Sequence, residues 1–186
     1  MFIYLTTHSA YSLQEGLLSP SELVHAAQTQ GMPALGLTDH LLLTGSVEFV
    51  HACKEAGIQP ILGLEIDLDT GKMALLATGM EGWSNLCRLS SALALRDDPE
   101  TTCSLEILEP YSKDLIILSS TQGDNSGQRL GHLKDAFNDR LYLTLQDPSV
   151  GLPLASISLR MKVPMVVTHP VYKARVPDFH VRDFLI

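Results

Sequence analysis

The chain of 186 residues has little cysteine and no long apolar run. Its thiols are Cys53, Cys87 and Cys103, and no pair of them has the CxxC spacing. This pattern suggests neither a disulfide framework nor a zinc site built from thiolates, so we expect three reduced thiols. The apolar run at residues 2–5 is too short for the core of a signal peptide, and no run approaches membrane-spanning length. We therefore expect a soluble, cytoplasmic protein that is not attached to a membrane.

Positive charge is also scarce, because 13 Lys and Arg residues face 21 Asp and Glu residues and give a formal net charge of -8. Neutralisation of phosphates by Lys and Arg supplies most of the nonspecific affinity for nucleic acid, so we expect no strong direct binding to it. Glycine-rich phosphate loops and nucleophile elbows are absent as well. A hydrophobic content of 45% with 18% charged residues predicts a globular chain with room for one domain.

What the chain does contain is an alternation of short apolar runs and segments with helical periodicity. Cap-like residues at Ser19 and a stop at Gly31 bound the first helical segment. Further helices are predicted at residues 46–56, 81–95, 105–108, 129–137 and 153–161. Strands are predicted at residues 2–5, 34–37, 58–68, 73–77, 115–118, 141–145 and 164–168. This alternation with short links predicts an α/β protein with a parallel sheet or barrel.

Several predicted strands end in residues that can bind a metal ion. Asp39 and His40 follow the second strand, and Glu65 lies in the third, with a helical crossover between them. Parallel strands joined in this way bring their carboxyl ends to the same edge, where His8 and His169 from other strands also belong. Imidazole and carboxylate ligands of this kind suit zinc, manganese or iron, which lower the pKa of bound water.

The same residues have plain structural interpretations. Asp39 can cap the segment that follows it, and His40 can be a hydrogen-bonded loop histidine. Glu65 needs a partner if it faces the core, but it needs none if it points outward on an edge strand. His25, His51, His132 and His180 lie in predicted helices and are expected on the surface.

Three motifs carry a resemblance to a known family: YLTTHSAYSL at residues 4–13, GMPALGLTDH at 31–40 and AGIQPILGLE at 56–65. Residues 75–77, 81–90 and 164–168 continue it in the same order. Together they resemble the polymerase and histidinol phosphatase (PHP) domain at the start of bacterial DNA polymerase III alpha subunits. The resemblance implies a distorted seven-stranded βα barrel, the PHP fold. It implies that residues 1–186 are a single PHP domain cut from a longer polymerase chain, and the apolar end at residues 184–186 agrees with truncation there.

The resemblance also implies a set of metal ligands, and here the sequence departs from the family. His8, Glu15, Asp39, His40 and Glu65 match ligand positions. The family's remaining ligand positions are occupied by poor donors, namely Thr6, Lys72, Thr121, Pro170 and Tyr172. A full trinuclear cluster is therefore not expected, and at most one divalent ion, zinc or manganese, would bind through the matching residues, with His169 as a further donor. Without a metal, we expect Glu65 to pair with Lys72.

Three functions follow from the resemblance. The first is a catalytically degenerate PHP domain of a replicative or error-prone polymerase, with a structural or partner-docking role. Its partners would be the polymerase body of the same chain and, as in some members, a proofreading exonuclease subunit, while nucleotidyl transfer belongs to the parent DNA-directed DNA polymerase. The second is a metal-dependent phosphoesterase or 3′-5′ exonuclease that acts through a reduced metal site, with Asp39 or His40 assisting proton transfer. The third is a stand-alone PHP-like protein.

Overall fold

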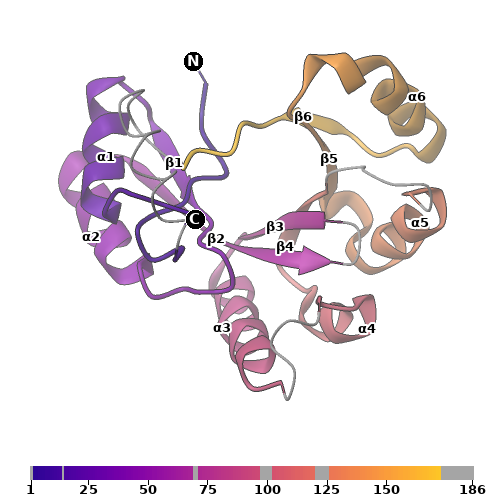
Figure 1. The fold of residues 1–186 in the computed structure, drawn as a ribbon, viewed down its shortest axis with the longest axis horizontal. Coiled ribbons are helices and arrows are strands. Elements are labelled where there is room, and N and C mark those ends of the chain that lie inside the picture. The colour runs from indigo at the N-terminus through magenta and orange to yellow at the C-terminus, as the bar shows by residue number, and fades with distance from the viewer. Residues whose placement is uncertain (1, 14, 69–70, 97–101, 120–125, 173–186) are drawn as a thin grey trace. The chain divides into compact units, whose positions relative to one another are not determined.

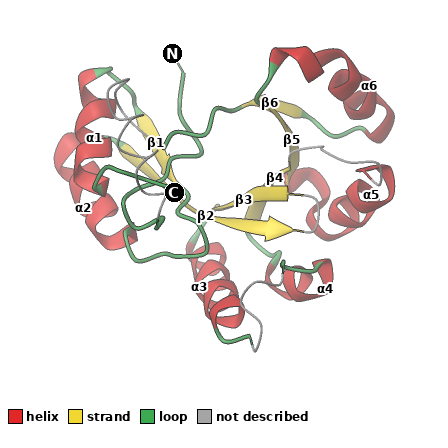
Figure 2. Ribbon diagram, viewed as in Figure 1, coloured by secondary structure: helices red, strands yellow, loops and turns green. Residues whose placement is uncertain are grey.

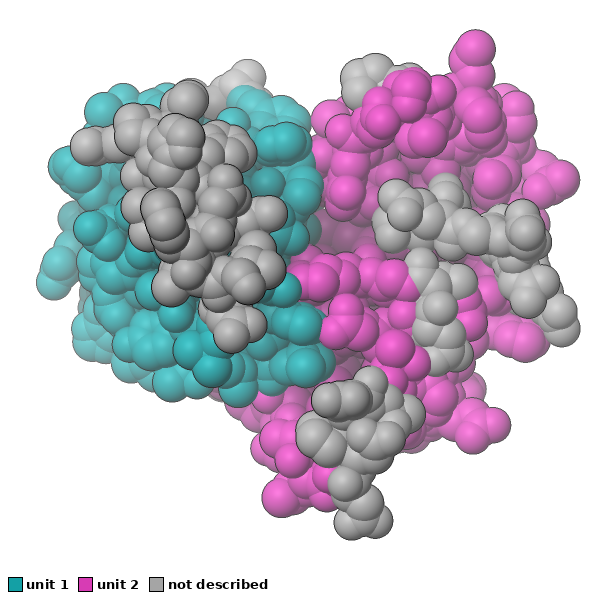
Figure 3. All heavy atoms as spheres, viewed as in Figure 1, with its two compact units in different colours: residues 1–64, 169–186 teal, residues 65–168 magenta. Residues whose placement is uncertain are grey.

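The computed structural model describes residues 2–13, 15–68, 71–96, 102–119 and 126–172 (Figure 1). They fall into two compact units, coloured separately in Figure 3. Unit 1 comprises Met1–Leu64 and His169–Ile186, and unit 2 comprises Glu65–Thr168. Thr121, His180 and the apolar end at residues 184–186 lie outside the described residues. The interpretation of residues 1–186 as one domain stays a prediction.

The described residues contain six α-helices and six strands (Figure 2). The helices are α1 (Pro20–Thr29), α2 (Ser46–Ala56), α3 (Met80–Ala94), α4 (Leu105–Leu108), α5 (Ser126–Phe137) and α6 (Gly151–Met161). The strands are β1 (Ala34–Leu37), β2 (Gln59–Leu68), β3 (Gly71–Ala77), β4 (Leu115–Ser119), β5 (Leu141–Leu145) and β6 (Met165–Val167). Short 3₁₀ helices at Glu109–Tyr111, Asn138–Arg140 and Pro148–Val150 complete the order. The α/β class is confirmed, with one predicted strand absent from this list.

The six strands form one sheet in the order β1-β2-β3-β4-β5-β6. β1 pairs in parallel with β2, β4 pairs in parallel with β5, and β5 pairs in parallel with β6. β3 and β4 are antiparallel, with Leu75 opposite Ile117. The sheet is therefore mixed, and the described residues provide six strands where the PHP resemblance implied seven.

The missing strand is the one predicted at residues 2–5. This segment does run beside β1, because Gly36 N donates to Tyr4 O at 2.8 Å and Thr38 N donates to Thr7 O at 2.8 Å. Between these bonds β1 advances two residues while the N-terminal segment advances three, so an extra residue interrupts the ladder. What remains is an isolated parallel bridge between Thr7 and Val171. The prediction of a regular strand here was wrong, although the segment occupies a strand-like path.

Each unit has its own apolar core. In unit 1, helices α1 and α2 pack together, and Phe49 and Cys53 of α2 are fully buried. The capping box between Ser19 and Glu22, with Pro20 in the first turn, fixes where α1 begins. In unit 2, α3 packs against β3, and Leu86 and Leu89 of α3 are fully buried. None of the helices in the described ranges combines the length and apolarity needed to cross a membrane.

Candidate metal centre

Asp39 lies just beyond the end of β1 and is only 1% exposed. Its carboxylate accepts three hydrogen bonds: from Ser9 N at 2.6 Å, from Ser9 Oγ at 2.7 Å and from Ser12 Oγ at 2.8 Å. A buried carboxylate needs such donors, and these satisfy Asp39 from within the chain. The side chain predicted as a metal ligand therefore faces the residues that follow His8.

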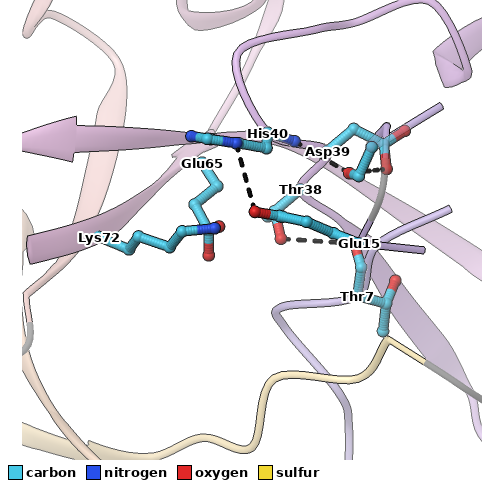
Figure 4. Close-up of polar contacts among 8 residues, drawn as sticks. Thr7, Glu15, Thr38, Asp39, His40, Glu65 and Lys72 are labelled. Carbon is cyan, nitrogen blue, oxygen red and sulfur yellow. Dashed lines mark hydrogen bonds and ion pairs between the residues drawn. The ribbon is translucent and has the colours of Figure 1, made fainter. Parts of the chain in front are cut away.

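His40 and Glu15 form the next contact of unit 1. His40 Nδ1 lies 3.5 Å from Glu15 Oε1, and about a quarter of each side chain is exposed, 23% and 26% (Figure 4). The His40 backbone is fixed as well, because His40 N donates to Ser12 Oγ at 3.0 Å. The structure thus joins two predicted ligands that are 25 positions apart in the sequence.

His8 is fully buried in unit 1. Its ring stacks on Tyr172, with 4.4 Å between the ring centroids and 20° between the planes. His8 and Glu15 each offer a ligand atom, and these atoms lie within 4.8 Å of one another. Imidazole and carboxylate are ligands that metal ions take, so His8 and Glu15 are candidate metal ligands within unit 1.

Glu65 belongs to unit 2, where Lys72 Nζ lies 3.0 Å from Glu65 Oε1 (Figure 4). The Glu65 side chain is 8% exposed and that of Lys72 is 37% exposed. The predicted pairing of these residues is confirmed. An ammonium group beside this carboxylate opposes the approach of a divalent cation to it.

The remaining positions where the sequence departs from the family, and the other histidines, have different surroundings. Thr6 is buried, and its hydroxyl has no hydrogen-bond partner among the described residues. Val171, between Pro170 and Tyr172, exchanges backbone hydrogen bonds with Thr6 and His8. His169 is exposed, and so are the helical histidines His25, His51 and His132, as expected. Thr121, as noted, is outside the described residues.

Ser9 and Ser12 are the residues that reasoning from the sequence missed. Both are fully buried, and both donate to Asp39. A signal exists in the sequence, since two hydroxyl residues closely follow His8, but serine is so common in loops that the signal is weak.

The chain is similar in sequence to known proteins. A family model described as "PHP domain" matches residues 5–148. An error-prone DNA polymerase from Symbiobacterium thermophilum is 32% identical over 99% of this chain and 20% of its own length. A DNA polymerase III subunit alpha from Caulobacter vibrioides is 31% identical over 100% of this chain and 19% of its own length. The chain thus spans about a fifth of the length of these curated relatives.

Two solved structures share the fold. An amidohydrolase from Chromobacterium violaceum, with bound sulfate and no metal, has a TM-score of 0.67 at 14% identity and covers 98% of this chain and 96% of its own. A two-domain protein from Bacteroides vulgatus, containing a predicted PHP-like metal-dependent phosphoesterase, has a TM-score of 0.64 at 16% identity. That match covers 92% of this chain and 52% of the Bacteroides protein. At these identities the likeness concerns the fold.

Proposed function

Because this chain belongs to the PHP domain family, we propose that residues 1–186 form a single PHP domain of a bacterial DNA polymerase III alpha-type chain, with a degenerate metal site. On this proposal the domain has a structural and partner-docking role. Its partners are the polymerase body of the same chain and a proofreading exonuclease subunit. The alignment of nearly the whole chain with polymerases that are about five times longer supports it.

The observation that carries the degenerate site is the ion pair of Glu65 with Lys72. A buried carboxylate in a metal centre is neutralised by the metal, whereas here an ammonium at 3.0 Å supplies the positive charge. The three hydrogen bonds to Asp39 also support a degenerate metal site, because they already satisfy a second carboxylate that was predicted to bind metal. The net charge of -8 also favours a domain that leaves DNA contacts to other parts of a polymerase.

The degenerate site is tested by metal analysis and hydrolysis on the purified chain. We expect less than one tightly bound zinc or manganese ion per chain, and no turnover of a single-stranded oligonucleotide or of p-nitrophenyl phosphate. Two or more bound ions, with metal-dependent turnover that disappears in His40→Ala, would overturn the proposal.

The polymerase assignment is tested separately by reading the gene beyond Ile186: an open frame of several hundred codons supports it, and an immediate stop codon contradicts it.

A second candidate function is favoured by the contacts of unit 1. His8 and Glu15 offer ligand atoms within 4.8 Å of each other, and Glu15 also contacts His40 at 3.5 Å. These residues would hold one divalent ion, which would supply an activated water for a phosphoesterase or 3′-5′ exonuclease. The PHP-like phosphoesterase with the same fold belongs to this class. One bound ion per chain, with turnover lost in Glu15→Gln, would favour this function over the first.

A further inference from the structure

Asp39 connects two parts of unit 1 that are far apart in the sequence. Its donors Ser9 and Ser12 precede it by 30 and 27 positions, and all three side chains are buried. We call described residues 9–13, 15 and 16 the serine loop. Asp39 Oδ1 accepts from Ser9 N and Ser12 Oγ, while Oδ2 accepts from Ser9 Oγ. The two carboxylate oxygens thus hold the loop at two positions.

The serine loop is also held by backbone hydrogen bonds between its own residues. Ser12 N donates to Ser9 O at 2.9 Å, and Ser12 O accepts from Glu15 N and Gly16 N at 3.0 Å each. A Cβ added to Gly16 would lie 1.9 Å from Ser9 O, so only glycine allows the loop to close on itself here. The position of Glu15 therefore depends on Ser12, one turn earlier in the loop.

Ser12 also contacts His40, the partner of Glu15. Its hydroxyl donates to Asp39 Oδ1 and accepts from His40 N at 3.0 Å. One hydroxyl therefore fixes the backbone of His40, while the carbonyl of the same residue fixes the backbone of Glu15. This explains how His40 Nδ1 and Glu15 Oε1 come to lie 3.5 Å apart.

From this geometry we propose that Asp39 is a positioning residue rather than a metal ligand. Its carboxylate anchors the serine loop, and through Ser12 it sets the contact between Glu15 and His40. The proposal goes beyond the assignment to a polymerase and does not depend on it, since every contact that it uses lies within unit 1. It applies equally whether or not an ion binds at His8 and Glu15.

The test compares Asp39→Ala and the milder Ser12→Ala with the natural chain by amide hydrogen exchange and by NMR. In Asp39→Ala we expect the amides of Ser9 and His40 to exchange at least tenfold faster, because Ser9 N loses its acceptor and Ser12 loses the carboxylate that holds it. In Ser12→Ala we expect the same of the His40 amide, because it loses its acceptor. We also expect the nuclear Overhauser contact between the His40 ring and the Glu15 side chain to disappear, while the signals of β1 remain. A role confined to overall stability would leave that contact intact in every chain that folds.

Glu48→Ala is the matched control. Glu48 is another carboxylate that accepts from serine, Ser21 Oγ at 2.8 Å, and from a residue of the serine loop, Tyr11 Oη at 3.4 Å, but both contacts are exposed. This variant should leave exchange at Ser9 and His40 within twofold of the natural chain. Unchanged exchange in Ser12→Ala, with the contact between His40 and Glu15 kept, would overturn the proposal. It would also be overturned if Mn²⁺ bound the natural chain and Ser12→Ala equally but failed to bind Asp39→Ala.

Discussion

Lys72 Nζ lies 3.0 Å from Glu65 Oε1, and the carboxylate of this pair is almost completely buried, with 8% of the side chain exposed. Unit 2 contains a second lysine–glutamate pair at nearly the same distance, 2.9 Å between Lys113 Nζ and Glu81 Oε1. The side chains of that pair are 70% and 50% exposed. The two pairs differ mainly in the burial of the carboxylate, so comparing them shows what a cation contributes beside a buried carboxylate.

We predict that Lys72→Met lowers the free energy of unfolding by about 1 to 3 kcal/mol, because it leaves the buried Glu65 carboxylate without this ammonium. Lys113→Met should change it by less than about 1 kcal/mol, since water screens the exposed pair. Urea unfolding of both variants at neutral pH gives the comparison. An equal decrease in the free energy of unfolding of both variants would show that burial of Glu65 does not strengthen its ion pair with Lys72.

Close approach of the N-terminal segment to β1 gives a second prediction. A Cβ on Gly36 would lie 2.2 Å from Leu5 O, whereas a Cβ on Gly131, in helix α5, would have nothing within 4 Å. Gly36→Ala should therefore destabilise the chain by about 1 to 3 kcal/mol through overpacking. Gly131→Ala should be neutral or stabilise it by about 0.5 to 1 kcal/mol, because alanine favours the helix. Thermal unfolding of both variants tests this, and a stable Gly36→Ala chain would contradict the close approach.

The elements could be predicted from the sequence because their signals are local. Helical periodicity, the cap at Ser19 and apolar runs located every α-helix and every strand that the structure describes, but not the three short 3₁₀ helices. The prediction of a strand at residues 2–5 was wrong because one extra residue interrupts the ladder with β1. Such a bulge cannot be recognised in an apolar run of the sequence. Val47 illustrates another limit: it is an apolar residue of α2, yet it is 69% exposed.

Within the candidate site, the identity of the residues was predictable but their partners were only partly so. The pairing of Glu65 with Lys72 could be expected because Lys72 replaces a family ligand with a cation seven positions from the glutamate. The serine donors of Asp39 could not, since hydroxyl contacts across about 30 positions depend on tertiary structure. Stacking of Tyr172 on His8 likewise joins the two ends of the described chain.

The start of α1 gives a third prediction. Ser19 Oγ accepts from Glu22 N, and the Glu22 carboxylate accepts from Ser19 N at 2.9 Å. Ser19→Ala should cost about 1 kcal/mol of stability because it removes the side-chain cap. Ser21→Ala, in the same first turn, serves as a neighbouring control that leaves the capping box intact. Denaturant unfolding that ranks Ser21→Ala as the more damaging change would contradict the capping role of Ser19.

Glu22 also gives the helix start a pH dependence. The hydrogen bond from the Ser19 backbone lowers the pKa of Glu22 below its ordinary value of 4.5. Since the pKa is lower in the folded chain, the stabilisation is present above pH 4.5 and is lost as the pH falls through the folded value. The difference in stability between the natural chain and Glu22→Gln should therefore shrink on acidification, as followed by denaturant unfolding from pH 7 to pH 3. A difference that grows as the pH falls would contradict the bond.

Cys53 gives the opposite dependence at alkaline pH. Burial in the core of unit 1 raises the pKa of the Cys53 thiol from 9.0 to about 11. Because the folded value is the higher one, the stabilisation is complete below pH 9.0 and is lost as the pH rises through about 11. On this basis the free energy of unfolding should fall by up to roughly 3 kcal/mol over that range. Cys53→Ala should start from a lower stability, because it leaves a small cavity, but it should lack this part of the decline. Urea unfolding at intervals between pH 8 and pH 11 separates the two effects, and parallel declines in both chains would show that the thiol titrates normally.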